Sequence, residues 1–304
     1  MSILSEPHFH NEAIAIVRLE AIVWPTGPYC PRCGSFDRIT TVRGGRAGLR
    51  RCGPCKREFT VTVGTLFESS HIKLHLWFQA AHLLASSKKG ISAHQLHRTL
   101  KVTYKTAWFM EHRLREAMRT GSLAPMGGVG GIVESDETFI GRKDGTIKRR
   151  GHGHKNAVLS LVDRKSKQVR SFHVDGTGAA DIVPIVKVNV AKETAMMTDE
   201  GGHYFTLGDH FASHESVSYK ADEYVRGDVH TNTVENFYSI FKRGMKGVYQ
   251  HCSEKHLHRY LAEFDFRYSN RVKLGVNDTA RATKALKGIV GKRLMYWDSS
   301  ATSF

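Results

Sequence analysis

The sequence contains no apolar run that approaches the roughly 18 residues of a membrane span. Its first ten residues lack a basic stretch followed by an apolar one, so we expect no signal peptide. It has no internal repeat and no low-complexity tract, and 40% of its residues are hydrophobic, as in folded globular proteins. These absences argue against membrane, secreted and disordered classes. We expect a cytoplasmic, nucleoid-associated protein.

Acidic residues are scarce relative to basic ones. The chain has 29 Asp and Glu against 45 Lys and Arg, which gives a formal net charge of +16. Such an excess favours a polyanionic partner, most simply nucleic acid. No basic amphipathic helix with a large apolar face is present to favour a membrane surface instead. The length of 304 residues is enough for about two domains.

The five cysteines are too few and too clustered for a disulfide framework. Four of them form two Cys-x-x-Cys pairs, Cys30 with Cys33 and Cys52 with Cys55, separated by 18 residues. Two such pairs supply the four thiolates of a tetrahedral Zn²⁺ site, and the spacing is that of a zinc ribbon. Because all four positions are cysteine, the expected zinc is structural. Cys252 lies far away and is expected to be a buried or idle thiol.

Residues 71–119 have a helical pattern that breaks at 88–90 and again near 101–102. Ser92 and Thr103 are suited to cap two consecutive helices joined by a tight turn, as in a helix-turn-helix. Five residues of the second helix are candidates to contact bases or phosphates: Thr103, Tyr104, Lys105, Thr106 and Arg113. A plain helical bundle remains the alternative.

The pattern changes to strands after a Gly-rich linker. Strands are expected at 131–136, 157–162, 168–174 and 194–199, with helices at 178–191, 233–249 and 253–270. Earlier in the chain a helix is expected at 10–22 and a strand at 58–63. This alternation predicts a mixed α/β domain.

Three acidic residues occupy element ends within that domain. Asp136 and Asp199 each end an expected strand, and Glu235 begins an expected helix. Three carboxylates placed in this way can hold two Mg²⁺ (or Mn²⁺) ions that activate an attacking oxygen and stabilise a leaving oxygen. Lys242 lies two helical turns after Glu235 on the same face, where it could contact a phosphate of DNA.

The chain resembles the insertion-sequence DDE transposases that have an N-terminal zinc ribbon, the ISXO2-like transposases. Its matching motifs, in order, are Trp24-Pro-x-Gly-Pro-x-Cys-Pro-x-Cys33, Val133-Glu-Ser-Asp-Glu-Thr-Phe-Ile-Gly141, Thr198-Asp-Glu200, His230-Thr-Asn-Thr-Val-Glu235, Lys242-Arg-Gly-Met-Lys-Gly247 and a run from His256 to Arg271. The resemblance covers roughly residues 10 to 275. It implies a ribonuclease-H-like catalytic fold, metal-dependent cleavage at element ends, and strand transfer by attack of a 3′-OH on target DNA.

Some acidic positions stay open. Members of the group vary at the third acidic position, and Asn232 offers an alternative to Glu235. Glu137 and Glu200 adjoin the chosen aspartates and are expected either to support the metal ligands from behind or to be solvated. Asp181 and Glu263 are candidates of lower rank. Residues 141–155 carry six Lys or Arg and are expected to form a mobile phosphate clamp, with a solvated hairpin loop as the alternative.

The expected organisation has six parts: an N-terminal helix and loop (1–27), a zinc ribbon (28–66), a helical DNA-binding segment (67–121), a linker (122–130), a catalytic domain (131–275) and a C-terminal tail (276–304). The expected function is DNA transposition, by a homodimer or higher oligomer assembled on DNA. A DNA-binding regulator on an inactive scaffold and a structure-selective nuclease are the alternatives.

Overall fold

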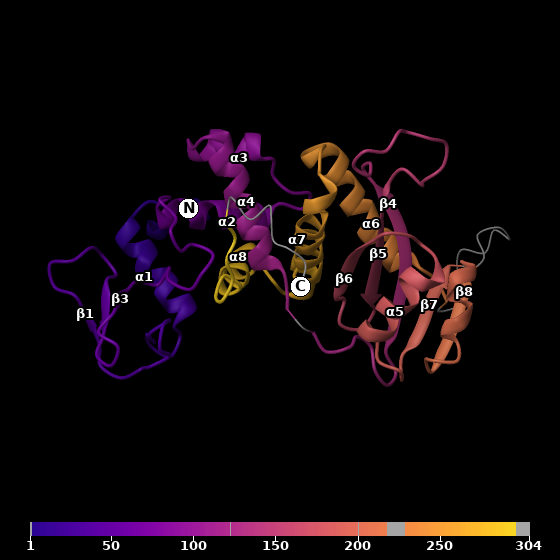
Figure 1. Ribbon diagram of the computed structural model, residues 1–304, viewed down its shortest axis with the longest axis horizontal. Coiled ribbons are helices and arrows are strands. Elements are labelled where there is room, and N and C mark those ends of the chain that lie inside the picture. The colour runs from indigo at the N-terminus through magenta and orange to yellow at the C-terminus, as the bar shows by residue number, and fades with distance from the viewer. Residues whose placement is uncertain (1, 122, 200, 218–228, 296–304) are drawn as a thin grey trace. The chain divides into compact units, whose positions relative to one another are not determined.

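The computed structural model describes residues 2–121, 123–199, 201–217 and 229–295. The chain divides into two compact units (Figure 1). Unit 1 comprises residues 1–87, 91–119 and 275–304, and unit 2 comprises 88–90 and 120–274. Within the described residues, no helix is long and apolar enough to cross a membrane.

The cysteine-bearing part of unit 1 is a small antiparallel sheet. It contains β1 (Ile39–Thr41), β2 (Arg50–Cys52) and β3 (Glu58–Phe59), in the order β1-β2-β3. The expected strand 58–63 is too long, because the chain leaves β3 after Phe59 and forms turns in which Val63 N–H donates to Thr60 O. The sheet is too small to bury a core of its own, so it depends on added cross-links such as a metal.

The remainder of unit 1 is helical. It contains short 3₁₀ turns at Ile3–Ser5 and Pro7–Phe9, followed by α1 (Glu12–Val23), α2 (Leu74–Ser86), α3 (Ala93–Leu100), α4 (Tyr104–Met118) and α8 (Asp278–Lys287). The segment expected as a C-terminal tail thus includes a helix, and α8 packs on α2 and α4. Arg281 joins α8 to α2 by donating to the Ala85 carbonyl at 2.9 Å.

Unit 2 is built on a five-stranded sheet. Its strands are β4 (Ile132–Ile140), β5 (Asn156–Asp163), β6 (Val169–Val174), β7 (Ala195–Asp199) and β8 (Ser213–Val217), in the order β6-β5-β4-β7-β8. β4, β5 and β6 are antiparallel neighbours, whereas β7 runs parallel to β4 and β8 parallel to β7. This is the strand order of the ribonuclease-H-like fold, and the predicted mixed α/β class is confirmed.

Helices cover both faces of this sheet. α6 (Asn232–Gly244) and α7 (Leu257–Ser269) pack on the face that includes Ile140 and Val158. α5 (Ala179–Asn189) and the 3₁₀ helix Gly202–Leu207 pack on the opposite face, which includes Val133 and Leu159. Successive side chains of a strand point to opposite faces, so β4 and β5 are buried on both sides.

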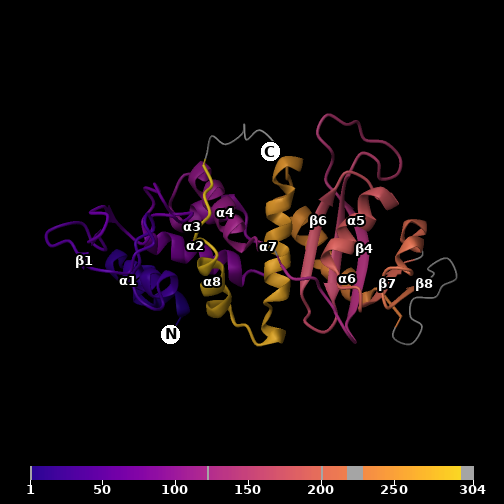
Figure 2. The same cartoon turned by 60° about the horizontal axis from the view of Figure 1, so that its bottom comes forward.

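After α6 the chain makes a π-helical turn at Met245–Tyr249 and a 3₁₀ turn at Glu254–His256 before α7 begins. α7 lies beside the edge strand β6 (Figure 2). Asp265 accepts hydrogen bonds from Ser171 N–H at 2.7 Å and Ser171 Oγ at 2.6 Å, and Ser269 Oγ accepts one from Val169 N–H. These side chains occupy donors that an open sheet edge would otherwise offer to another strand.

Candidate functional site

The four cysteines of the ribbon converge on one point. Their sulfurs all lie within 4.8 Å of one another, and both Cys30–Cys55 and Cys33–Cys52 Sγ–Sγ distances are 3.7 Å. A tetrahedral ion with Zn–S bonds of about 2.3 Å requires sulfurs roughly 3.8 Å apart. The spacing therefore fits Zn²⁺ bound by four thiolates, whereas Cys252 lies in the other unit and is not part of the group.

Electrostatics at the quartet are also those of a cation site. Burial opposes ionisation of the Cys30 thiol, but N–H donors from Arg32 and Cys33 lower its pKa to about 7. At Cys52 a backbone N–H from Cys55 favours the thiolate, yet burial and the neighbouring sulfurs raise its pKa to about 12. The second and later negative charges therefore become stable only when a cation joins them.

The α3–α4 segment has the geometry expected for a helix-turn-helix. Ser92 Oγ accepts from Gln95 N–H and Thr103 Oγ1 accepts from Thr106 N–H, so both helices begin at the predicted caps. Lys101 takes a left-handed conformation (φ 53°) in the three-residue turn between them. This turn directs the chain from one helix into the next.

The side chains expected to face DNA divide into two groups. Thr103, Tyr104 and Lys105 are exposed at the start of α4, and Thr106 beside them is half-buried. Arg113 is buried, and its guanidinium lies 4.6 Å from the Phe109 ring centre and donates to the Leu294 carbonyl. The expectation that Arg113 contacts DNA is therefore wrong, because the C-terminal segment covers this part of α4.

The strand register of unit 2 places Asp136 and Asp199 next to each other. The parallel pairing joins Ile132 to Ala195 and Glu134 to Met197, and the same offset of 63 residues separates Asp136 from Asp199. Asp136 does not end its strand as expected, because β4 continues to Ile140 in its antiparallel pairing with β5. It lies instead where β7 ends and the parallel pairing stops.

Glu235 reaches the same region from α6. Repulsion from carboxylates acts on Asp136, whose pKa rises to about 7 because of burial first and then of Glu137, Asp199 and Glu235. Local donors bind all three expected site carboxylates: Glu137 N–H binds Asp136 (2.7 Å), Gly201 N–H binds Asp199 (3.0 Å) and Thr231 Oγ1 binds Glu235 (3.0 Å). The charges of Asp199 and Glu235 therefore act on a carboxylate, Asp136, that is fixed in place by its own backbone contact.

This group is more open than the cysteine quartet. Among the described residues, the cysteines are the one set of three or more Cys, His, Asp or Glu whose ligand atoms converge closely enough to hold a single ion. A set of oxygen ligands that a cation would draw together, and that keeps room for water and phosphate oxygens, suits Mg²⁺ better than a closed site does.

Lys242 lies close to Asp136, and two further lysines lie close to Lys242. Burial lowers the pKa of Lys242, attraction to Asp136 raises it, and the charges of Lys246 and Lys155 lower it further. Lys242 also lies 5.8 Å from the Tyr238 ring centre. Lys155 belongs to the long β4–β5 connection, which is tied down by Lys143 Nζ donating to the Asp175 carbonyl at 2.7 Å. Positive charge from the connection and from α6 therefore accompanies the carboxylates.

The other acidic candidates have separate roles. Glu137 points to the α5 side of β4 and accepts from the Tyr204 hydroxyl. Asp181 accepts from Gly178 N–H at the start of α5, and Glu263 is buried in an ion pair with Arg267 at 2.8 Å. Glu200 lies outside the described residues. Asn232, the alternative to Glu235, is exposed in the first turn of α6.

One buried acid of the region was not among the site residues expected from the sequence. Glu134, two residues before Asp136, is fully buried and forms a close ion pair with Arg164, with a Nε–Oε1 distance of 2.6 Å. The motif Val133-Glu-Ser-Asp136 already placed Glu134 close to Asp136 in the sequence. The residue type alone, however, does not distinguish a buried carboxylate from an exposed one.

Two domain families match the chain. The ISXO2-like transposase domain matches residues 128–269, and the transposase zinc-ribbon domain matches residues 10–58. The chain therefore carries an ISXO2-like transposase domain and, before it, a transposase zinc-ribbon domain. The resemblance inferred from the motifs is confirmed, as is the presence of a zinc ribbon.

Among curated proteins, the chain is 28% identical over 288 residues to an uncharacterized protein in transposable element ISH50 of Halobacterium salinarum. The alignment covers 85% of this chain and 91% of that protein. Among solved structures, the chain is 14% identical to one chain of a simian T-cell lymphotropic virus intasome in complex with PP2A regulatory subunit B56 gamma, with a TM-score of 0.29. That match covers 56% of this chain and 67% of the other. The fold assignment depends on the strand order and the family matches.

Proposed function

We propose that this protein is a metal-dependent DNA transposase that binds the ends of an insertion element, cleaves there, and joins a 3′-OH end to target DNA. The observation that supports the proposal is that Asp136 lies beside the end of β7, near enough to Asp199 and Glu235 for their charges to act on it. Burial and the neighbouring acids Glu137, Asp199 and Glu235 disfavour the ionised Asp136 in the absence of a cation, and carboxylates perturbed in this way are concentrated at catalytic centres.

Asp136, Asp199 and Glu235 are the residues that would hold Mg²⁺ or Mn²⁺. Two such ions would activate the attacking oxygen and stabilise the leaving oxygen of the phosphodiester. The chain's own contribution is to fix the carboxylates on a strand pair and a helix start, where the backbone cannot move far. Burial of Asp136 keeps its surroundings at low polarity, so charges that meet there interact strongly.

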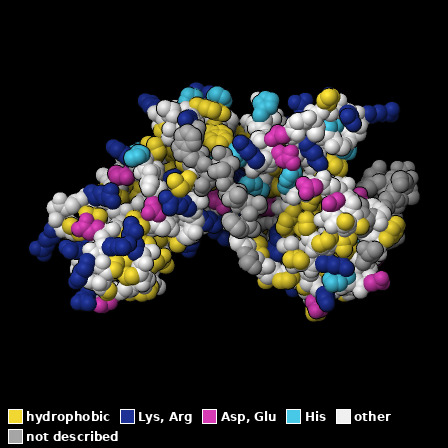
Figure 3. Space-filling view, in the orientation of Figure 1, with side chains coloured by type: hydrophobic (Ala, Val, Ile, Leu, Met, Phe, Trp, Pro, Cys, Tyr) yellow, Lys and Arg dark blue, Asp and Glu magenta, His cyan; other side chains and the backbone are white. Residues whose placement is uncertain are grey.

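Lys242 is proposed to bind a phosphate of the DNA end beside the carboxylates. Lys242 is half-buried, and its amine lies close enough to Asp136 to interact with that charge. The charges of Lys155 and Lys246 also act on the Lys242 amine. Cations at this position neutralise backbone phosphates without discriminating between bases. The net charge of +16 supports the same partner, and Lys and Arg are distributed over unit 1 on the face that Figure 3 shows.

Unit 1 is proposed to supply the DNA-end recognition. The zinc quartet would stabilise the ribbon, and the exposed start of α4 would enter the major groove in the way of recognition helices. Strand transfer of an element joins two DNA ends, so we propose a homodimer or higher oligomer on DNA. Its place of action would be the cytoplasm, on nucleoid DNA.

A strand-transfer assay tests the proposal. Purified protein, a labelled element end with a free 3′-OH, a plasmid target and Mg²⁺ or Mn²⁺ should give joined product. Asp136→Asn, Asp199→Asn and Glu235→Gln should each abolish joining and keep DNA binding. Asp181→Asn, which removes an acid bonded at the start of α5, is the matched control and should retain joining.

The alternatives give different results on the cognate end. Cleavage without joining would identify a nuclease, and binding alone a regulator. Full activity of Glu235→Gln together with loss of activity in Asn232→Ala would move the third position to Asn232.

A further inference from the structure

The helix that carries Glu235 is not capped by the side chain of its N-cap residue, although the first N–H, of Asn232, donates to His230 Nδ1 at 3.3 Å. Thr231 stands at the N-cap position of α6, but its side chain makes no capping hydrogen bond there. Its hydroxyl donates instead to Glu235 Oε1. The first N–H groups of a helix have no partner within the helix and need an acceptor from elsewhere.

Glu134 supplies that acceptor from β4. Its Oε2 accepts from Thr233 N–H at 2.8 Å and from Val234 N–H at 2.9 Å. These are the second and third residues of α6, where a capping oxygen normally binds. A negative charge at this end also interacts favourably with the helix dipole.

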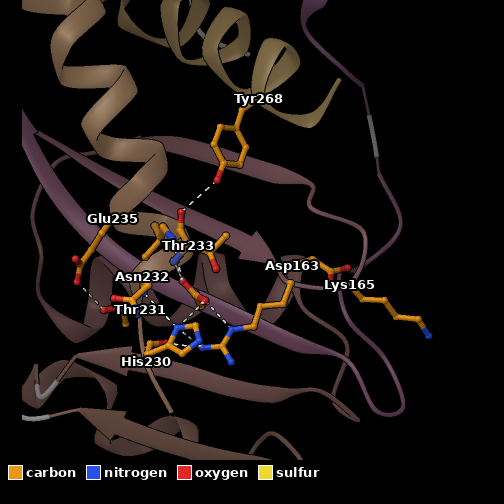
Figure 4. Close-up of polar contacts among 11 residues, drawn as sticks. Asp163, Lys165, His230, Thr231, Asn232, Thr233, Glu235 and Tyr268 are labelled. Carbon is orange, nitrogen blue, oxygen red and sulfur yellow. Dashed lines mark hydrogen bonds and ion pairs between the residues drawn. The ribbon is translucent and has the colours of Figure 1, made fainter. Parts of the chain in front are cut away.

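Arg164 closes the arrangement from the turn after β5. Its Nε donates to Glu134 Oε1, and its Nη2 donates to the His230 carbonyl at 2.7 Å and to His230 Nδ1 at 2.9 Å (Figure 4). Arg164 N–H also donates to the Ile132 carbonyl, which fixes this turn to β4. One guanidinium therefore joins the capping carboxylate to the residue that precedes the N-cap.

Glu134 and Asp136 share one strand and one face. They are two residues apart on β4, so both side chains point toward α6. One turn farther along the helix, the Tyr238 hydroxyl donates to the Asp136 carbonyl. α6 is thus attached to β4 at both levels, with Glu235 between the attachments.

We propose that Glu134, with Arg164 and His230, is a positioning residue that sets Glu235 against Asp136 and thereby fixes the geometry of the metal site. This proposal rests on the proposed function of that site. Glu134 is not a metal ligand, because it is fully buried and its two oxygens accept from Arg164, Thr233 and Val234. Glu134 would act on Glu235 indirectly, by fixing the first turn of α6. In other proteins, residues that bond to the metal ligands orient those ligands in a comparable way.

Two measurements on the full chain test the proposal. In hydrogen exchange, Glu134→Gln should accelerate exchange at Thr233 and Val234 about tenfold, since it weakens their shared acceptor. In Mn²⁺ titrations followed by electron paramagnetic resonance without DNA, the same variant should need about 10- to 100-fold more Mn²⁺ for half-saturation. Glu134→Asp keeps the charge and should recover part of both effects.

Asp265→Asn is the matched control. Asp265 is partly buried and also accepts from a backbone N–H, but its hydrogen bonds to Ser171 join α7 to β6 and not α6 to β4. Its replacement should leave Mn²⁺ half-saturation within about threefold of the wild type, which separates positioning from a general loss of stability.

Each outcome decides a different question. Faster exchange in Glu134→Gln with unchanged Mn²⁺ half-saturation would show a structural cap only and would overturn the positioning role. Unchanged exchange and unchanged Mn²⁺ half-saturation would overturn the capping role as well. A wild-type chain whose Mn²⁺ binding is absent, or is unaffected by Asp136→Asn, would overturn the proposed function and the positioning proposal together.

Discussion

Replacing Asp136 by Asn should make the metal-free protein more stable while it removes a ligand of the proposed metal site. The pKa of Asp136 is raised to about 7, chiefly by burial and also by Glu137, Asp199 and Glu235. Above that pH the folded protein must carry the ionised carboxylate in unfavourable surroundings. Asn has nearly the same shape and can still accept from Glu137 N–H through its carbonyl oxygen, so the change removes charge with little loss of packing.

The size of the effect follows from the pKa shift. The ordinary pKa of Asp is 3.8, so the carboxyl of Asp136 stays protonated to a pH about three units higher in the folded state than in the unfolded state. Between these two pKa values the folded state binds more protons, so stability falls as pH rises. At about 1.4 kcal/mol per unit the upper limit is about 4 kcal/mol. Because Asp136 is only partly buried, we expect a gain of about 2 kcal/mol for Asp136→Asn at pH 8 and almost none at pH 4.

Denaturant unfolding in EDTA at both pH values measures the gain. Mn²⁺ at about 100 times its dissociation constant should stabilise the wild type by about 2.7 kcal/mol and leave the variant unchanged. Asp209→Asn, at an exposed position of unit 2, controls for simple loss of a negative charge. A variant that is less stable than the wild type at pH 8 without metal, or whose stability difference does not vary with pH, would refute the reasoning.

Three further predictions concern other parts of the chain. Cys52→Ser should lose the one Zn²⁺ per chain expected in elemental analysis and unfold the ribbon, while Cys252→Ser should keep both zinc and fold. Burial raises the pKa of Asp265 to about 7, so the stability that this residue contributes falls as pH rises from about 4 to 7. Asp265→Asn should therefore flatten the curve of melting temperature against pH over that range. Lys105→Ala should weaken DNA binding and reduce the slope of log affinity against log salt concentration by about one, and it should leave the melting temperature unchanged. Arg113→Ala should lower the melting temperature, because Arg113 is buried.

Much of the architecture was predictable because strong local signals coincide with it. The Cys-x-x-Cys pairs identify the ribbon, and capping residues such as Ser92 and Thr103 mark helix starts that the structure keeps. Apolar strand runs located four of the five strands of the large sheet. These signals depend on a few neighbouring residues, so no knowledge of distant contacts is needed to find them.

The missed elements depend on distant contacts. β8 (Ser213–Val217) is mostly polar and forms as an edge strand because β7 offers its free side. α8 has a short amphipathic pattern near the end of the chain and is stabilised by packing on α2 and α4. The length of β4 was underestimated for a related reason, since its last residues are held by β5 across the hairpin. Local propensity is weaker than such tertiary pairing.

The run Glu134-Ser-Asp136-Glu137 shows why the candidate site could be located more readily than its parts could be assigned. Alternation along β4 sends Glu137 to the α5 side, where the Tyr204 hydroxyl binds it, and sends Glu134 and Asp136 together toward α6. What separates those two is their partners. Glu134 meets two helix N–H groups and a guanidinium, which stabilise its charge. Asp136 accepts from the Glu137 N–H and lies near other carboxylates. Its ionised form is therefore poorly stabilised by the protein, and a bound cation would stabilise it. Partners contributed by α6 and the turn after β5, not residue type or spacing, therefore make one acid a structural cap and its neighbour a candidate metal ligand.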